Sequence, residues 1–305
     1  MEHHLKIVLT LTIGLGLASL LGYLTQRIRL PSILGYLIAG YIIGPYSPGF
    51  VADAEVSEQL AEIGVILMLF GVGLHFKLED LINVKNIAIP GALGQTFAAT
   101  VFGTSLVYSL GWPIQSGIII GLAIGVASTV VLVRVLTDNR LLDTPQGHIS
   151  VGWLVVEDIL TVAVLILLPL LATFYSGAEL SFLSVTGSVI FVLAKFVALA
   201  ILMFTWGQRL VAYILTNVAR LRSHELFTLT VIALVFLIAT GSALIFGTSI
   251  ALGAFIAGMV IGQTDVRHQA AANALPLKDI FAIIFFLSIG MLFNPIALKD
   301  SIALF

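Results

Sequence analysis

Long apolar stretches alternate with short polar breaks along nearly the whole chain. A stretch of roughly 20 apolar residues, at 1.5 Å per residue, is long enough to cross the hydrocarbon core of a bilayer as an α-helix. Charged, Gly and Pro residues mark the breaks and predict ten such spans. The spans are expected near residues 5–25, 31–47, 57–75, 84–109, 114–136, 150–174, 181–213, 225–246, 249–263 and 278–294. The pattern therefore indicates an all-α polytopic membrane protein.

The basic residues fall in every second loop between these spans. Eleven Lys and Arg lie on one side, whereas only Lys6 and Lys299 lie on the other and Lys195 lies inside a span. Because cytoplasmic loops carry the excess of Lys and Arg, this asymmetry predicts that the N-terminus is on the outer face. The eleven are Arg27, Arg29, Lys77, Lys85, Arg134, Arg140, Arg209, Arg220, Arg222, Arg267 and Lys278.

Composition supports a bilayer environment and excludes several functions. The chain is 59% hydrophobic and 10% charged, with a mean hydropathy of +1.13, far from the composition of soluble domains. The absence of cysteine excludes disulfides and thiolate metal or catalytic sites. The basic residues form no stripe, so nucleic acid is not an expected partner. No small-residue cleavage site follows the first apolar stretch, which we interpret as a retained span.

Two adjacent acids, Glu157 and Asp158, lie inside the span near 150–174 and are flanked by apolar residues. An ionised side chain near the bilayer centre costs about 2.5–3.5 kcal/mol on insertion scales, so such residues usually face a cavity and serve transport. Consecutive helical residues point about 100° apart, which predicts different roles for the two carboxylates. We expect Asp158 to line a cation path, and Glu157 to face a neighbouring helix, where it either binds a second proton or pairs with a base. The alternative is an interfacial pair solvated by water.

Lys195 is the basic residue well inside a span, in Val192-Leu-Ala-Lys195. One intramembrane cation and two intramembrane anions suggest a Lys195–Glu157 pair. The alternative is that Lys195 satisfies carbonyls or extends its ammonium along a tilted helix toward the interface.

Glycines and hydroxyl residues predict local unwinding in the span near 114–136. Gly121 and Gly125 precede Ser128-Thr129-Val130 there, and hydroxyls can satisfy backbone groups freed by a break. Transporters use broken helices to aim helix ends at a substrate, although Gly and Ser also serve ordinary close packing. Glu62 and His75, at the two ends of the span near 57–75, are expected to be solvated, with His75 a candidate for sensing cytoplasmic pH.

Seven motifs in order resemble those of Kef-type monovalent cation/proton antiporters, and most closely their YbaL-like subgroup, over essentially the whole chain. They are Gly35-Tyr-Leu-Ile-Ala-Gly40 with Gly44-Pro45, Glu62-Ile-Gly64 leading to Phe70-Gly71-Val-Gly73, Ala127-Ser-Thr129-Val-Val-Leu, Glu157-Asp158, Glu225-Leu-Phe227, Ala251-Leu-Gly253-Ala-Phe255, and Phe285-Phe286-Leu-Ser-Ile-Gly290-Met291.

The resemblance implies the sodium/proton-antiporter fold of thirteen helices, with inverted repeats and two broken helices that cross at the site. Ser128, Thr129 and Val130 would form the first crossing, and Asp158 would bind cation and proton in turn. It also implies a bacterial inner-membrane protein that moves a core domain against a dimerisation domain, and hence a homodimer. Spans one to three and eight to ten would split between those domains.

Two departures from the family pattern stand out. Many Kef-type members have Gln before the Asp and electrogenic relatives have Asp-Asp, whereas this chain has Glu157. Residues 1–305 also provide about ten of the thirteen helices, so the exchanger domain is expected to be truncated. The second broken helix and a nucleotide-binding regulatory domain would be missing, and the isolated chain is expected to be inactive or unstable.

The sequence therefore predicts exchange of K⁺ or Na⁺ for H⁺ by a non-enzymatic transporter that holds no cofactor or resident metal. The alternatives are a transporter of another small solute on the same fold and a truncated, non-transporting fragment. An intramembrane aspartyl protease is excluded, because adjacent acids on one helix cannot face each other as that chemistry requires.

Overall fold

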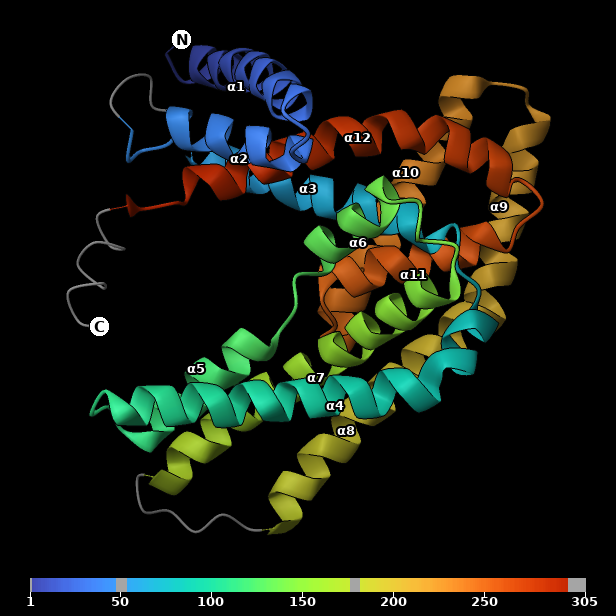
Figure 1. The fold of residues 1–305 in the computed structure, drawn as a ribbon. Helices are drawn as coiled ribbons and strands as arrows, with labels where there is room; N and C mark the ends of the chain where they lie inside the picture. The colour runs from blue at the N-terminus through green and yellow to red at the C-terminus, as the bar shows by residue number, and fades with distance from the viewer. Residues whose placement is uncertain (1, 48–53, 176–181, 296–305) are drawn as a thin grey trace. The chain divides into compact units, whose positions relative to one another are not determined.

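The computed structural model describes residues 2–47, 54–175 and 182–295, and these residues form helices joined by short connections (Figure 1). No strand occurs in these ranges. The helices in chain order are α1 (Glu2–Arg27), α2 (Ser32–Ile43), α3 (Ala54–Gly73), α4 (Leu78–Ser109), α5 (Ile114–Gly125), α6 (Thr129–Asp138), α7 (Pro145–Tyr175), α8 (Phe182–Ile201), the π-helix η1 (Leu202–Gly207), α9 (Gln208–Arg220), α10 (His224–Gly241), the π-helix η2 (Ser242–Phe246), α11 (Ile250–Gly262) and α12 (Arg267–Met291).

Each of the ten predicted spans corresponds to one helical stretch, with α5–α6, α8–η1–α9 and α10–η2 each forming a single stretch. Five helices of the described chain are long and apolar enough to cross a membrane, or up to seven if each of two bent helix pairs counts as one span. Two helices are shorter than the spans predicted for them. Helix α2, in the predicted span 31–47, has 12 residues, and α11, in the predicted span 249–263, has 13. Helices of this length extend only about 20 Å, less than a full hydrocarbon core.

The chain divides into two compact units, of which the first comprises Met1–Met68 and Ala272–Phe305. In this unit α1 packs against α2. Buried side chains of α1, α2 and α12 form its core, and Gly40 and Gly290 let the backbones of α2 and α12 meet. The core residues are Ala18, Ala39, Ile43, Leu287 and Met291.

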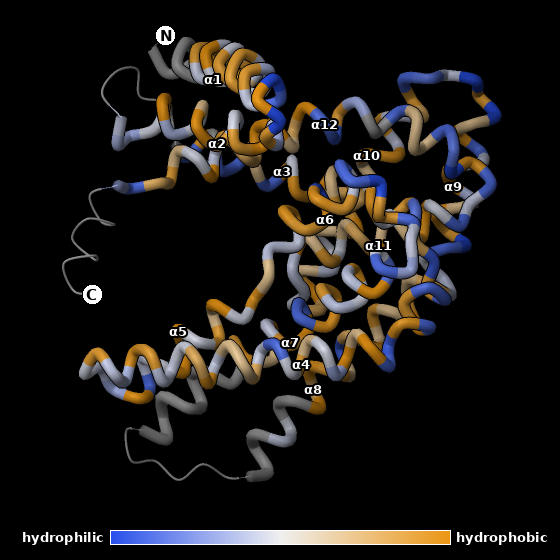
Figure 2. Tube along the Cα trace, in the orientation of Figure 1, coloured by the Kyte–Doolittle hydropathy of each residue, from blue (hydrophilic) through white to orange (hydrophobic). Residues whose placement is uncertain are grey.

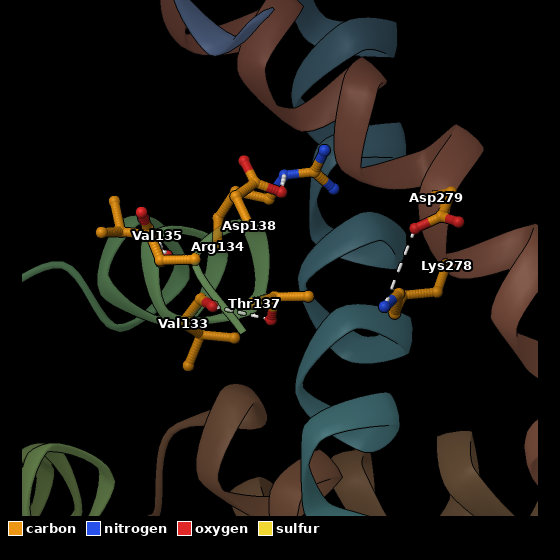
Figure 3. A network of polar contacts seen from close by, with 8 residues as sticks. Val133, Arg134, Val135, Thr137, Asp138, Lys278 and Asp279 are labelled. Carbon is orange, nitrogen blue, oxygen red and sulfur yellow. Dashed lines mark hydrogen bonds and ion pairs between the residues drawn. The ribbon is translucent and has the colours of Figure 1, made fainter. Parts of the chain in front are cut away.

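The second unit comprises Leu69–Ala271, and α4 lies in it alongside α5 and α7 (Figure 1). Helix α11 packs against α10, and every α11 residue from Leu252 to Gly262 is buried. In Figure 2, hydrophobic residues follow the helices, whereas hydrophilic residues gather at the turn after α9. On the last turn of α6, Arg134 Nε lies 3.2 Å from Asp138 Oδ1, and Thr137 Oγ1 donates to the Val133 carbonyl (Figure 3).

Two glycines of this unit, Gly73 and Gly258, bring the end of α3 against the middle of α11. A Cβ built on Gly258 would lie 2.8 Å from the Gly73 Cα and would collide with the Phe70 carbonyl oxygen. Small residues at such crossings let two helices make backbone contact, which stabilises helix association where no hydrophobic effect acts between the helices.

We therefore expect Gly258→Ala to lower the free energy of unfolding by about 1–3 kcal/mol, because backbone atoms cannot move aside as a flexible side chain can. Thermal unfolding of the detergent-solubilised chain measures this change. Gly241→Ala is the matched control, since a Cβ there meets nothing within 4 Å. Equal melting temperatures for the two variants would contradict this packing.

Candidate functional site

The span Ile114–Asp138 is interrupted at Val126, Ala127 and Ser128, between α5 and α6. Ser128 is the N-cap of α6, and its hydroxyl accepts a hydrogen bond from the Val131 N–H at 3.4 Å. The predicted crossing residues thus lie at this break: Ser128 is exposed, Thr129 begins α6 and Val130 is buried. The broken helix expected from the sequence is present.

Glu157, on α7, is 3% exposed and accepts three hydrogen bonds. Its Oε1 accepts from Gln95 Nε2 at 2.7 Å and from Trp153 Nε1 at 3.0 Å. Its Oε2 accepts from the Ala127 N–H at 3.1 Å, inside the break between α5 and α6. A buried carboxylate is thereby matched with a backbone donor that has no helical partner.

The local sequence explains how these donors reach Glu157. Trp153 precedes Glu157 by one helical turn, so the two side chains lie on the same face of α7. Gly91 of α4 faces the Trp153 indole, and a Cβ at that position would collide with the ring. Gln95, one turn after Gly91 on α4, also donates to the Gly125 carbonyl at 3.2 Å. Gln95 and Glu157 together therefore satisfy backbone groups on both sides of the break.

Asp158 points to a different part of the second unit. Its side chain lines a small cavity together with residues of α3, α6, α7 and α11, among them Thr129, Leu252 and Phe255. The Ser249 hydroxyl lies near this carboxylate. Ser249 is the N-cap of α11 and accepts from the Leu252 N–H at 3.1 Å, which leaves its O–H free to donate. The two adjacent acids thus contact the N-terminal ends of two different helices, α6 and α11.

The structure does not bring the other candidate residues to this pair. Lys195 and Glu157 form no ion pair in the described chain, and Lys195 Nζ lies 4.8 Å from the ring centre of Phe191, one turn earlier on α8. His75 is exposed after the end of α3, where its Nδ1 donates to the Gly71 carbonyl at 2.9 Å. Glu62 is exposed on α3.

Three residues at the site were missed by the sequence reasoning. Gln95 is a strongly polar residue inside an apolar span, and Trp153 lies one turn before Glu157, so both carried a signal. Ser249 follows Gly247, whose φ of 73° ends the π-helix η2, and a Gly-Thr-Ser sequence between apolar stretches is a helix-start signal.

The site is suited to binding small cations through oxygen atoms. Asp158 has mostly apolar surroundings, with the residues Ser249 and Thr129 nearby, so its charge must be neutralised by a proton or by a cation when it is buried. Among the described residues, no group of three or more His, Asp or Glu is arranged to hold a multivalent metal ion.

Comparison with known proteins agrees with this arrangement. The sodium/hydrogen exchanger transmembrane family matches residues 15–305. YbaL of Escherichia coli (strain K12), which carries a provisional name as a cation/proton antiporter, is 45% identical over 298 residues, covering 98% of this chain and 53% of YbaL. The glutathione-regulated potassium-efflux protein KefC of Klebsiella pneumoniae is 32% identical over 282 residues, covering 92% of this chain and 44% of KefC.

Among solved structures, the sodium proton antiporter MjNhaP1 of Methanocaldococcus jannaschii superimposes with a TM-score of 0.56. The match covers 98% of this chain and 73% of that one at 18% identity, which supports a shared fold. The chain therefore belongs to the sodium/hydrogen exchanger family, and the predicted resemblance and fold are confirmed. It spans about half the length of YbaL and KefC.

We expect Gln95→Leu to lower the free energy of unfolding by about 1–3 kcal/mol, because the Gly125 carbonyl and Glu157 each lose a donor in an apolar environment. Thermal unfolding in detergent measures the loss. Gln263→Leu is a suitable control, since Gln263 is exposed just after α11. If both substitutions change the melting temperature equally, Gln95 does not support the break.

Proposed function

We propose that this chain forms the ion-exchanging domain of a secondary transporter that exchanges a monovalent cation, K⁺ or Na⁺, for H⁺ across the membrane. The proposal rests mainly on Asp158, a partly buried acid in a membrane-spanning helix, beside the ends of two further helices, in a chain of the sodium/hydrogen exchanger family. The exchange needs no cofactor, because one carboxylate can hold either a proton or a cation.

Asp158 is the ion-binding residue in this proposal because its partners can adapt to a cation. A hydroxyl can donate to the carboxylate in one state and turn its lone pairs toward a cation in the other. Ser249 supplies such a hydroxyl, and Thr129 supplies a second on the wall of the same cavity. The N-terminal ends of α6 and α11 carry partial positive charge, which stabilises the ionised form of the Asp158 carboxylate.

Glu157 has a supporting role in this proposal. All three of its partners are N–H groups, which can only donate. Three N–H dipoles directed at one carboxylate disfavour a cation at the same oxygens. Glu157 therefore holds the break between α5 and α6 in place, while Asp158 exchanges its ligand.

We propose that the N-terminus lies on the outer face, on the basis of the charge asymmetry of the loops. A bacterial inner membrane is proposed from the family resemblance. We propose a homodimer from the family resemblance. We also propose that residues 1–305 belong to one exchanger domain. An organic anion is a less suitable substrate, because the site contains two acids and Lys195 lies against Phe191.

In everted vesicles, we expect Asp158→Asn to abolish cation-dependent dequenching of a pH-sensitive dye, because an amide can neither ionise nor release a proton. Addition of K⁺, Na⁺ or Li⁺ to vesicles with the unmodified protein identifies the ion. Because the chain spans about half of YbaL, the experiment is done both with this chain and with the same substitution in a full-length relative.

Asp265→Asn is the matched control, since Asp265 is exposed between α11 and α12, and it should retain exchange. Glu157→Gln should retain part of the activity and lower the melting temperature. Exchange that survives Asp158→Asn at the unmodified rate would exclude Asp158 as the ion carrier.

A further inference from the structure

A groove of about 310 Å³ runs along one face of α1 in the first unit. Helix α1 contributes residues from Leu15 to Gln26, α2 contributes Ser32 and Tyr36, and α12 contributes Ile283. Leu15 and Gln26 are eleven residues apart, so the groove is about 16 Å long at 1.5 Å per residue. That length is close to the depth of one leaflet, half of a hydrocarbon core of about 30 Å.

The polarity of the groove changes along its length. Leu15 and Ala18 line its deep end, whereas Gln26 and Ser32 line the end next to the loop between α1 and α2. Between these ends the Tyr36 ring packs over Gly22, where a Cβ would lie 2.7 Å from Cε1 of the ring. Tyrosines near a membrane surface typically place an apolar ring in hydrocarbon and a hydroxyl among headgroups. The groove is therefore apolar at its deep end and polar toward the membrane surface.

Two exposed arginines follow the polar end of the groove along the chain. Arg27 is in the last turn of α1, directly after Gln26, and Arg29 lies two residues further on. Asp279 lies one turn before Ile283 on α12, and its Oδ1 is 3.7 Å from the Lys278 ammonium, so its charge is already paired (Figure 3). The segment that follows the polar end of the groove therefore carries two positive charges.

Arg29 also occupies a backbone conformation that a glycine would adopt more easily. Its φ is 62°, and α1 ends in a Schellman motif, with Leu30 N–H donating to the Thr25 carbonyl and Arg29 N–H to the Gln26 carbonyl. Among described non-glycine residues, only Arg29, Arg140 and Arg222 have positive φ. An arginine at a cap that favours glycine costs stability, so its side chain is expected to have another role.

We propose that this groove binds an anionic phospholipid, with one acyl chain along the α1 face and the phosphate beside Arg27 and Arg29. The length of the groove, its change from apolar to polar and the two positive charges that follow its polar end all match one lipid of the cytoplasmic leaflet. Each Lys or Arg near the surface of the cytoplasmic leaflet contributes about 1 kcal/mol of attraction to anionic lipids. The proposal rests on the membrane topology and not on the exchange reaction.

Native mass spectrometry of the delipidated 305-residue chain tests the proposal, with phosphatidylglycerol and phosphatidylcholine of identical acyl chains as probes. We expect phosphatidylglycerol to bind more tightly, and Arg29→Gly to lower its affinity about fivefold, as expected for loss of one basic contact near a membrane surface. Arg29→Lys should retain the preference. Arg140→Gly is the matched control, because it relieves the same backbone conformation at the end of α6 and should leave phosphatidylglycerol binding unchanged.

A second pair of variants tests the acyl-chain position. Ser19→Trp fills the groove and should weaken binding of both lipids, whereas Leu24→Trp, on the opposite face of α1, should not. Equal affinities for the two lipids, or equal effects of Arg29→Gly and Arg140→Gly, would overturn the headgroup site. Displacement by soluble glycerol phosphate alone would overturn the acyl-chain part, and a change of oligomeric state in Ser19→Trp would instead indicate a protein interface.

Discussion

The second unit depends on how an interrupted helix satisfies its backbone inside a membrane. In hydrocarbon, an N–H or C=O group without a partner costs several kcal/mol, so a break must be supplied with donors and acceptors by neighbouring helices. At the break between α5 and α6, Glu157 accepts from the Ala127 N–H and Gln95 donates to the Gly125 carbonyl. One residue from α7 and one from α4 therefore hold the break, and the ends of α5 and α6 keep fixed positions relative to Asp158.

This arrangement gives two neighbouring acids different surroundings. The helical rotation of about 100° between consecutive residues directs Glu157 toward the break and Asp158 toward the start of α11. Glu157 accepts hydrogen bonds from N–H donors with fixed directions, whereas Asp158 lies near the rotatable hydroxyl of Ser249. A site that alternates between two ligands needs the adaptable partner, and a structural support needs the fixed ones.

The sequence predicted the spans and the break, because both follow from local patterns. Ten apolar stretches become ten helical stretches within the described ranges, and the Ser128-Thr129 sequence becomes the start of α6. It predicted less of the site, because contacts between helices depend on packing that one sequence does not specify. Charge alone suggested Lys195 as the partner of Glu157. Instead, Gly91 leaves room for the Trp153 ring between α4 and α7, and the neutral donors Gln95 and Trp153 bind Glu157. Helix length was also overestimated for α2, where Pro45 follows Gly44 and cannot continue the helix.

The partners of Glu157 also bear on stoichiometry. A cation at Glu157 would have to displace the N–H group of Gln95, Trp153 or Ala127 from the carboxylate. A displaced Ala127 N–H would then have no acceptor within the break. In the proposed exchange, a cation at Asp158 leaves the backbone undisturbed, because Ser249 still accepts from the Leu252 N–H when its O–H turns away. Exchange confined to one carboxylate moves one H⁺ for each monovalent cation, which transfers no net charge. For the exchange proposed above, the hydrogen bonds of Glu157 are thus an argument for an electroneutral reaction.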